Sequence, residues 1–219
     1  MYIPGYQRVD DPERLWAVVE AESFASLICA GDDELPVCTQ VPFIRREGKL
    51  WAHLAAANPQ GELLASGRPV LCQFLGPHAY ISPSWYLTDN QVPTWNFVQV
   101  SVTGIARELD AEKSHWVVEQ TVREHESHRA DPWPFERMAE TTEMLLRGIR
   151  AFEIVVNGIE GRFKLSQNKS AEERSAVARE LRGTGRPLER AVGELMEGAE
   201  LMEAAELMED AEPGDSVAP

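Results

Sequence analysis

The sequence lacks an apolar run long enough to cross a bilayer, and its first residues lack the basic start and apolar stretch of a secretory signal. Cysteine is scarce, with Cys29, Cys38 and Cys72 widely spaced among apolar neighbours and no pair at CxxC spacing. The five histidines form no HxxxH or similar cluster. We therefore expect a cytoplasmic protein with reduced thiols that act as small buried hydrophobic residues, and no structural zinc site.

Basic residues are also few, with 21 Lys and Arg against 36 Asp and Glu, for a net charge of −15. Residues 193–219 hold nine acids and no Lys or Arg, which leaves −6 on residues 1–192. Because DNA affinity depends largely on neutralising phosphates with Lys and Arg, this balance makes direct DNA binding doubtful. The sequence also shows no helix-turn-helix pattern with a basic recognition helix.

Length and composition predict one sizeable globular domain with an appendage. We assign residues 1–190 to the domain and residues 191–219 to an acidic low-complexity tail. The tail repeats Glu-Leu-Met-Glu at 194, 200 and 206, a six-residue period that gives no single apolar stripe on a helix. We interpret it as a solvated tail, helical or frayed, and docking to a partner is the alternative.

Many short strands precede several helices, which predicts an α+β fold rather than alternating βαβ units. Asp11 and Pro12 begin a helix, Arg45-Arg-Glu-Gly48 makes a turn, and Gly76-Pro77 ends the most apolar strand. The predicted strands are 24–31, 37–44, 49–54, 69–75, 78–82, 96–108 and 152–157. The predicted helices are 11–22, a short one from 58 towards 66, 111–126, 141–148 and 171–181. This pattern is typical of a closed or nearly closed β-barrel decorated by helices.

Two segments carry chemical information. Tyr80, Trp85, Tyr86 and Trp95 fall within sixteen residues, among small hydroxyl and amide side chains. Such a set makes walls for a flat ring with polar edges. Packing of a barrel rim or of a subunit interface is the alternative, which composition alone favours. The second segment, Lys164-Leu-Ser-Gln-Asn168, offers a cation, a hydroxyl and two amides that can bind a phosphate or a ring carbonyl. Its alternative is a polar turn before a helix capped by Ser170.

The order of several motifs resembles one known family, the PaiB-type FMN-binding negative transcriptional regulators of the FMN-binding split-barrel superfamily. The matching pieces are Met1-Tyr-Ile-Pro4, Val41-Pro-Phe43, His53-Leu-Ala55, Asn58-Pro-Gln60, Gly76-Pro-His-Ala-Tyr-Ile-Ser-Pro-Ser-Trp-Tyr86, Val92-Pro-Thr-Trp-Asn96 and Lys164-Leu-Ser-Gln-Asn168. The resemblance implies a six-stranded antiparallel barrel, a homodimer, and an FMN pocket at the dimer interface. The implied cofactor residues are His53, Leu54, Ala55, Asn58, Tyr80, Ser82, Trp85, Thr94, Trp95 and Asn96, with Lys164, Ser166, Gln167 and Asn168 from the second subunit.

Three positions depart from the family pattern. Gln40 replaces a histidine, Ala56 replaces an arginine, and Phe97 replaces a tyrosine. An arginine is a natural ligand for the doubly charged FMN phosphate, and one charge-assisted contact contributes roughly 1.5–3 kcal/mol. Its loss predicts weakened FMN binding, or a pocket that has changed its ligand. The remaining basic candidates are Lys164, Arg68, Arg45 and Arg46.

Three functions stay open at this point. The resemblance implies a regulatory or ligand-sensing protein. A flavin-dependent oxidoreductase acting on an unknown small substrate is the alternative, with His53 and His78 as nearby proton carriers, although no catalytic constellation is identified. Haem binding ranks third, because some split barrels bind haem and the five histidines are His53, His78, His115, His125 and His128.

Overall fold

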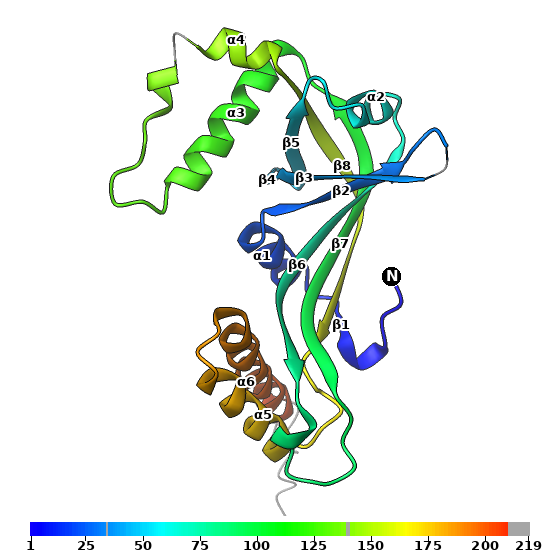
Figure 1. The fold of residues 1–219 in the computed structure, drawn as a ribbon, viewed down its shortest axis with the longest axis vertical. Helices are drawn as coiled ribbons and strands as arrows, with labels where there is room; N and C mark the ends of the chain where they lie inside the picture. Colours follow the sequence, from blue (N-terminus) through cyan, green and yellow to red (C-terminus); the bar gives the residue numbers. More distant parts are fainter. Residues whose placement is uncertain (34, 139–140, 210–219) are drawn as a thin grey trace, which may run out of the picture. The chain divides into compact units, whose positions relative to one another are not determined.

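The computed structural model describes residues 1–33, 35–138 and 141–209, with side chains described as far as residue 198. An eight-stranded sheet runs in the order β3-β2-β6-β7-β8-β5-β4, and β1 pairs with β8 (Figure 1). Strand β2 is antiparallel to β3 and to β6, and β5 is antiparallel to β4 and to β8. The strands are β1 (Arg8–Val9), β2 (Phe24–Ala30), β3 (Pro36–Pro42), β4 (Ile44–Arg46), β5 (Lys49–Ala55), β6 (Pro69–Ile81), β7 (Thr94–Glu108) and β8 (Ile149–Lys164).

The two ends of this strand order are consecutive in the chain. The order starts at β3 and finishes at β4, which follow one another across Phe43. The edges are therefore held together covalently, as in a sheet that curls towards closure. Six strands have seven or more residues, and β1 and β4 are short additions. The α+β split-barrel prediction is confirmed, with these two extra strands.

The described residues form six α-helices and three short 3-10 turns. Asp11 caps the first of them by accepting a hydrogen bond from the Glu13 amide, as predicted, and Ser170 caps the fifth through the Glu173 amide. They are α1 (Pro12–Ala21), α2 (Gln60–Ala65), α3 (Ala111–Glu126), α4 (Thr142–Arg147), α5 (Ala171–Gly183) and α6 (Pro187–Glu209), with the short 3-10 turns η1 (Gly5–Gln7), η2 (Pro83–Trp85) and η3 (Phe135–Met138).

The chain forms two compact units, and the long strands β6, β7 and β8 each run from one into the other. Unit 1 comprises Met1 with residues 9–76 and 99–161, and unit 2 comprises residues 2–8, 77–98 and 162–219. In unit 1 the Phe43 and Phe74 rings meet in the core at 5.4 Å. In unit 2, α5 packs on α6, and Gly193 lies so close to the Ala178 carbonyl of α5 that a larger residue would collide with it.

Several sequence expectations differ from the structure. Gly76-Pro77 does not end a strand, because β6 continues to Ile81. The pairing of β2 with β6 covers residues 70–73 of β6, so Pro77 lies beyond that neighbour, where a missing N–H is tolerated. The predicted strand 152–157 extends to the whole of β8.

Two further differences concern cysteine and the tail. Cys29 and Cys72 are buried free thiols as predicted, but Cys38 is exposed because it lies on the open face of β3, opposite Ile28. Helix α6 crosses the predicted domain boundary at 190 and 191 and continues to Glu209. The rest of the predicted tail, residues 210–219, lies outside the described residues.

Candidate functional site

The predicted cofactor residues fall into two groups, one in each unit. His53, Leu54, Ala55 and Asn58 belong to unit 1. The other ten belong to unit 2. They lie at the end of β6 and just after it, at the start of β7, and at the end of β8 and just after it, and they are Tyr80, Ser82, Trp85, Thr94, Trp95, Asn96, Lys164, Ser166, Gln167 and Asn168. Each group is described within its own unit.

Unit 2 brings the two polar motifs of the sequence together. Asn96 is fully buried, and its Nδ2 donates to Ser166 Oγ at 3.0 Å and to Met196 Sδ at 3.4 Å. Lys164 Nζ donates to Thr94 Oγ1. The Asn96–Ser166 and Lys164–Thr94 bonds each join residues 70 positions apart, because β7 and β8 are neighbours in the sheet. The Thr94-Trp-Asn96 and Lys164-Leu-Ser-Gln-Asn168 segments therefore form one site.

Part of this second segment builds its own turn. Ser166 has a positive φ of 63°, a left-handed conformation that costs energy in any residue with a side chain. Gln167 closes the turn, since its Oε1 accepts from the Leu165 amide at 2.8 Å and its Nε2 donates to the Phe163 carbonyl at 2.5 Å. Asn168 is exposed. Gln167 therefore has the role of a turn residue, which was the alternative predicted for this segment. The side chains of Lys164 and Asn168 face outward.

Aromatic rings line the outer face of β6 and β7 in unit 2. Trp95 and Phe97 alternate with buried Asn96 and Val98, so the two rings share the open face. Trp95 is 54% exposed and meets the Tyr80 ring edge-on, with centroids 6.2 Å apart. Large aromatic side chains with this much surface exposed to solvent offer faces on which a planar ring can stack.

A pair of cations continues this face on β8. Arg162 and Lys164 alternate with buried Phe163 and Leu165, and the Arg162 guanidinium lies 5.1 Å over the Phe97 ring. Arg162 donates to Gln7 Oε1 at 2.8 Å and to the Tyr2 carbonyl at 3.4 Å. Burial, with the Arg162 charge as a second cause, holds the pKa of Lys164 below its ordinary value. Among the described residues neither cation has a carboxylate partner, so their positive charge is available to an anion.

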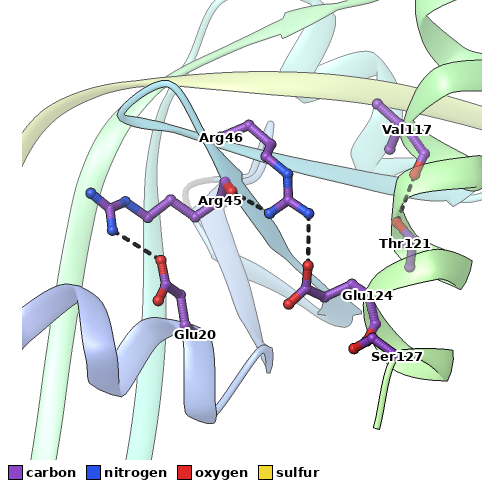
Figure 2. Close-up of polar contacts among 7 residues, drawn as sticks. All are labelled: Glu20, Arg45, Arg46, Val117, Thr121, Glu124 and Ser127. Carbon is purple, nitrogen blue, oxygen red and sulfur yellow. Dashed lines mark hydrogen bonds and ion pairs between the residues drawn. The ribbon is translucent and has the colours of Figure 1, made fainter. Parts of the chain in front are cut away.

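The other basic candidates are tied to carboxylates in unit 1. Figure 2 shows Arg45 bonded to Glu20 of α1 at 2.9 Å and Arg46 bonded to Glu124 of α3 at 2.7 Å. Arg45 also lies 4.6 Å over the Trp16 ring. These contacts hold α1 and α3 against the β4 strand, which is a structural role.

Arg68 is likewise engaged. It donates to the Ala30 and Gly31 carbonyls at 2.9 and 2.8 Å and pairs with Asp32, so it braces the turn between β2 and β3. Arg162 was not among the candidates drawn from the sequence. The signal that identifies it is its position two residues before Lys164 on the same strand face.

The unit 1 group centres on His53 of β5. Burial holds the pKa of this imidazole below its ordinary value, and its Nδ1 is buried without a hydrogen-bond partner among the described residues. Leu54 is a core residue, whereas Ala55 and Ala56 are exposed. An unpartnered buried nitrogen in a native protein is a ready acceptor or donor for a ligand.

Asn58 and Gln40 have structural partners in unit 1. Asn58 Nδ2 donates to Thr39 Oγ1 at 3.0 Å, and its Oδ1 accepts from the Gln60 amide. Gln40, at the position of the family histidine, donates to Ser26 Oγ at 2.6 Å. In unit 2, Ser82 caps η2 by accepting from the Ser84 amide at 3.3 Å, and Trp85 lies half-buried in that turn.

Comparison with known proteins gives the following likenesses. Residues 1–158 match the family model described as "Putative FMN-binding domain". The chain is 33% identical, over 90% of its length and 97% of the other protein, to protease synthase and sporulation protein PAI 2 of Bacillus subtilis. Its fold is similar to the FAD and haem binding protein of Mycobacterium smegmatis, with a TM-score of 0.59, 15% identity, and coverage of 78% of this chain and 79% of that one. It is also similar to a flavocytochrome of Azotobacter vinelandii, with a TM-score of 0.54, 15% identity, and coverage of 80% and 78%.

Proposed function

Because this chain belongs to the PaiB-like FMN-binding family, as both its family model and its Bacillus relative establish, we propose that it is a regulatory, ligand-sensing protein that binds FMN on the outer face of unit 2. The observation that carries the proposal is the pair Arg162 and Lys164, two adjacent cations without a carboxylate partner among the described residues. In a chain of net charge −15 such a pair is a specific anion site rather than a general basic surface.

The residues present fit the cofactor. An FMN phosphate carries close to two negative charges, which Arg162 and Lys164 match, and Thr94 adds a hydroxyl beside Lys164. The Trp95 and Tyr80 rings of the neighbouring strands offer a surface for an isoalloxazine ring. Bound FMN would supply redox chemistry or a light-absorbing, ligand-dependent reporter, while these residues bind and orient it.

A homodimer is part of the proposal. The family resemblance implies that the segment 164–168 approaches the cofactor from the second chain. The outer face of β2 and β6 in unit 1 supports an interface, because Phe24 is 67% and Leu75 is 52% exposed there. Large apolar side chains left exposed are available for protein–protein contacts. A cytoplasmic location is also proposed, and the three free cysteines support it.

Regulation through a ligand or a protein partner fits the charge better than autonomous DNA reading does. The acidic balance of residues 1–192 opposes binding to the phosphate backbone of DNA. No helix among the described residues is both long and apolar enough to span a membrane.

The deciding experiment is an absorption spectrum of the purified protein followed by FMN titration against tryptophan fluorescence. We expect saturable binding of one flavin per chain, and a dimer by sedimentation. A folded protein that binds no flavin at several hundred micromolar FMN would contradict the proposal.

A second candidate, a flavin-dependent oxidoreductase, is favoured by His53. A neutral imidazole with an unpartnered Nδ1 is a suitable proton acceptor near neutral pH. Oxidation of NADH or NADPH that requires FMN and falls strongly in a His53→Gln variant would support this reading. Turnover that is unchanged in the variant would count against His53 as the proton carrier. Haem binding stays a prediction of the sequence alone.

A further inference from the structure

The N-terminal segment of unit 2 contains a buried glutamine that contacts Arg162. Residues 5–7 form the turn η1, in which the Gln7 amide donates to the Pro4 carbonyl at 2.9 Å. Strand β1 follows at once and pairs with β8, the strand that carries Arg162. This pairing brings Gln7 to Arg162, although the two residues are 155 positions apart. Only 4% of Gln7 is exposed, so packing restricts the position of its side-chain amide.

Three contacts hold the Arg162 guanidinium, all within unit 2. Its Nε donates to Gln7 Oε1 at 2.8 Å, and its Nη1 donates to the Tyr2 carbonyl at 3.4 Å. Its Cζ lies 5.1 Å from the centre of the Phe97 ring, within the range of cation–π contacts. Nη2 donates no hydrogen bond among the described residues, so its two N–H groups are available to a ligand.

The acceptors that hold Arg162 are uncharged, which distinguishes it from Arg45 and Arg46. Arg45 is bonded to the carboxylate of Glu20 at 2.9 Å (Figure 2). Arg46 is bonded to the carboxylate of Glu124 at 2.7 Å. A carboxylate orients a guanidinium but also neutralises it, whereas an amide or carbonyl oxygen orients it and leaves its charge for an anion.

We propose that Gln7 is a positioning residue of the FMN site, which holds Arg162 in the orientation that binds the phosphate and leaves the guanidinium charge unpaired. The inference rests on the proposed function, because it takes Arg162 and Lys164 as the phosphate site. A long side chain that is ordered only on binding lowers affinity, and fixing it beforehand removes that cost. Gln7 is too buried to be a main phosphate ligand itself, so it acts through Arg162.

Two substitutions of Gln7 separate the orientation of Arg162 from its charge. Gln7→Met keeps a side chain of similar length and removes the acceptor, so FMN Kd should rise several-fold. Gln7→Glu keeps the acceptor and pairs Arg162 with a carboxylate, so FMN Kd should rise about tenfold or more, the size expected for one lost charge-assisted contact. Flavin fluorescence titration at fixed ionic strength measures both values.

The matched control is Gln120→Glu, which adds the same charge on α3 in unit 1. It should leave FMN Kd within about twofold of the parent value, since surface charges far from a site are screened by salt. A Gln7→Glu variant that binds FMN as the parent does, or an equal loss in Gln120→Glu, would overturn the proposal.

Riboflavin, which lacks the phosphate, distinguishes positioning from a general role in folding. Neither substitution of Gln7 should change riboflavin Kd by more than about twofold, because riboflavin makes no contact that depends on Arg162. The preference for FMN over riboflavin should therefore fall in both variants. Equal weakening of the two flavins would indicate a purely structural role and would overturn the proposal.

A double-mutant cycle tests whether Gln7 acts through Arg162. In an Arg162→Ala background, Gln7→Met should change FMN Kd by no more than about twofold further. A second several-fold loss in that background would contradict the proposal. A folded parent that binds no FMN would overturn the proposed function and this inference together, whereas a parent that binds FMN and Gln7 variants with the same Kd would overturn the inference alone.

Discussion

Asn96 Nδ2 donates to Ser166 Oγ over 3.0 Å, and this bond fastens the start of β7 to the turn that follows β8. Both side chains are buried, and Ser166 is held in a left-handed backbone conformation beside the bond. The Asn96 amide and the Ser166 hydroxyl, which lie in two segments predicted to hold a cofactor, are therefore hydrogen-bonded to each other. We infer that this pair positions the neighbouring Thr94, Trp95 and Lys164.

Asn96→Ala should therefore lower stability. It leaves the buried Ser166 hydroxyl without its partner, a loss of about 1–3 kcal/mol in the free energy of unfolding. Urea denaturation followed by far-UV circular dichroism measures it. Asn168→Ala, in the same segment but exposed, is the matched control and should change stability by less than about 0.5 kcal/mol. A larger loss in the control than in Asn96→Ala would contradict the positioning role.

Removing either cation of the β8 pair should weaken FMN binding. Arg162→Ala and Lys164→Ala each delete one charge-assisted contact to the phosphate, about 1.5–3 kcal/mol, which corresponds to roughly 10- to 100-fold in Kd. Flavin fluorescence titration at fixed ionic strength gives the Kd. Arg129→Ala, a surface arginine paired with Glu126 in unit 1, should leave it unchanged. Equal effects of all three substitutions would mean only general electrostatic attraction.

Features of the fold that depend on local chemistry could be predicted from the sequence, and features that depend on the order of the strands could not. The cap at Asp11, the turn at Glu47 and Gly48, which have φ of 53° and 72°, and the alternation in β7 depend on local chemistry, and they were predicted. The continuation of β6 through Pro77 was missed, because it depends on which neighbour β6 keeps beyond Gln73. The pairing of Asn96 with Ser166 depends likewise on sheet order.

The same limit applies to the charged residues. In the sequence Arg45, Arg46, Arg68, Arg162 and Lys164 are equivalent cations. Only the fold shows that Glu20, Glu124 and Asp32 neutralise the first three, since these partners lie up to 78 positions away. The sequence therefore indicates which segments carry the candidate site, whereas its charge balance depends on the fold.

Arg68→Ala tests whether this arginine is structural. The substitution removes the donors to the Ala30 and Gly31 carbonyls, so we expect a loss of stability on the order of 1–2 kcal/mol. Thermal and urea unfolding measure the loss, and FMN Kd should stay within twofold at a temperature where the variant is folded. A stable variant with much weaker FMN binding would contradict the structural role and would indicate that Arg68 binds the phosphate.

Restoring the family arginine should strengthen FMN binding. Ala56 is exposed, and its amide already bonds the Gly148 carbonyl at 2.8 Å, so Ala56→Arg adds a side chain without disturbing the backbone. The family resemblance implies that the segment 164–168 of one chain meets the segment 53–58 of the other chain at the cofactor. In that dimer we expect FMN Kd to fall at least several-fold, with little change in stability. Ala57→Arg, one residue further along the exposed turn, controls for added charge alone. An unchanged Kd in Ala56→Arg would contradict the hypothesis that its loss weakened the phosphate site.

His53 should make stability depend on pH in a defined window. Burial lowers its pKa in the folded protein, whereas in the unfolded chain the pKa returns to its ordinary value near 6.5. Between those two values the unfolded chain binds more protons, so the free energy of unfolding falls as the pH drops below about 6.5 and levels off above it. Melting temperatures from about pH 5 to 7.5 should show this slope in the parent and a smaller one in His53→Gln. His128→Gln, at an exposed position, should retain the parent slope, and an equal slope in all three proteins would mean that His53 is not buried as a neutral imidazole.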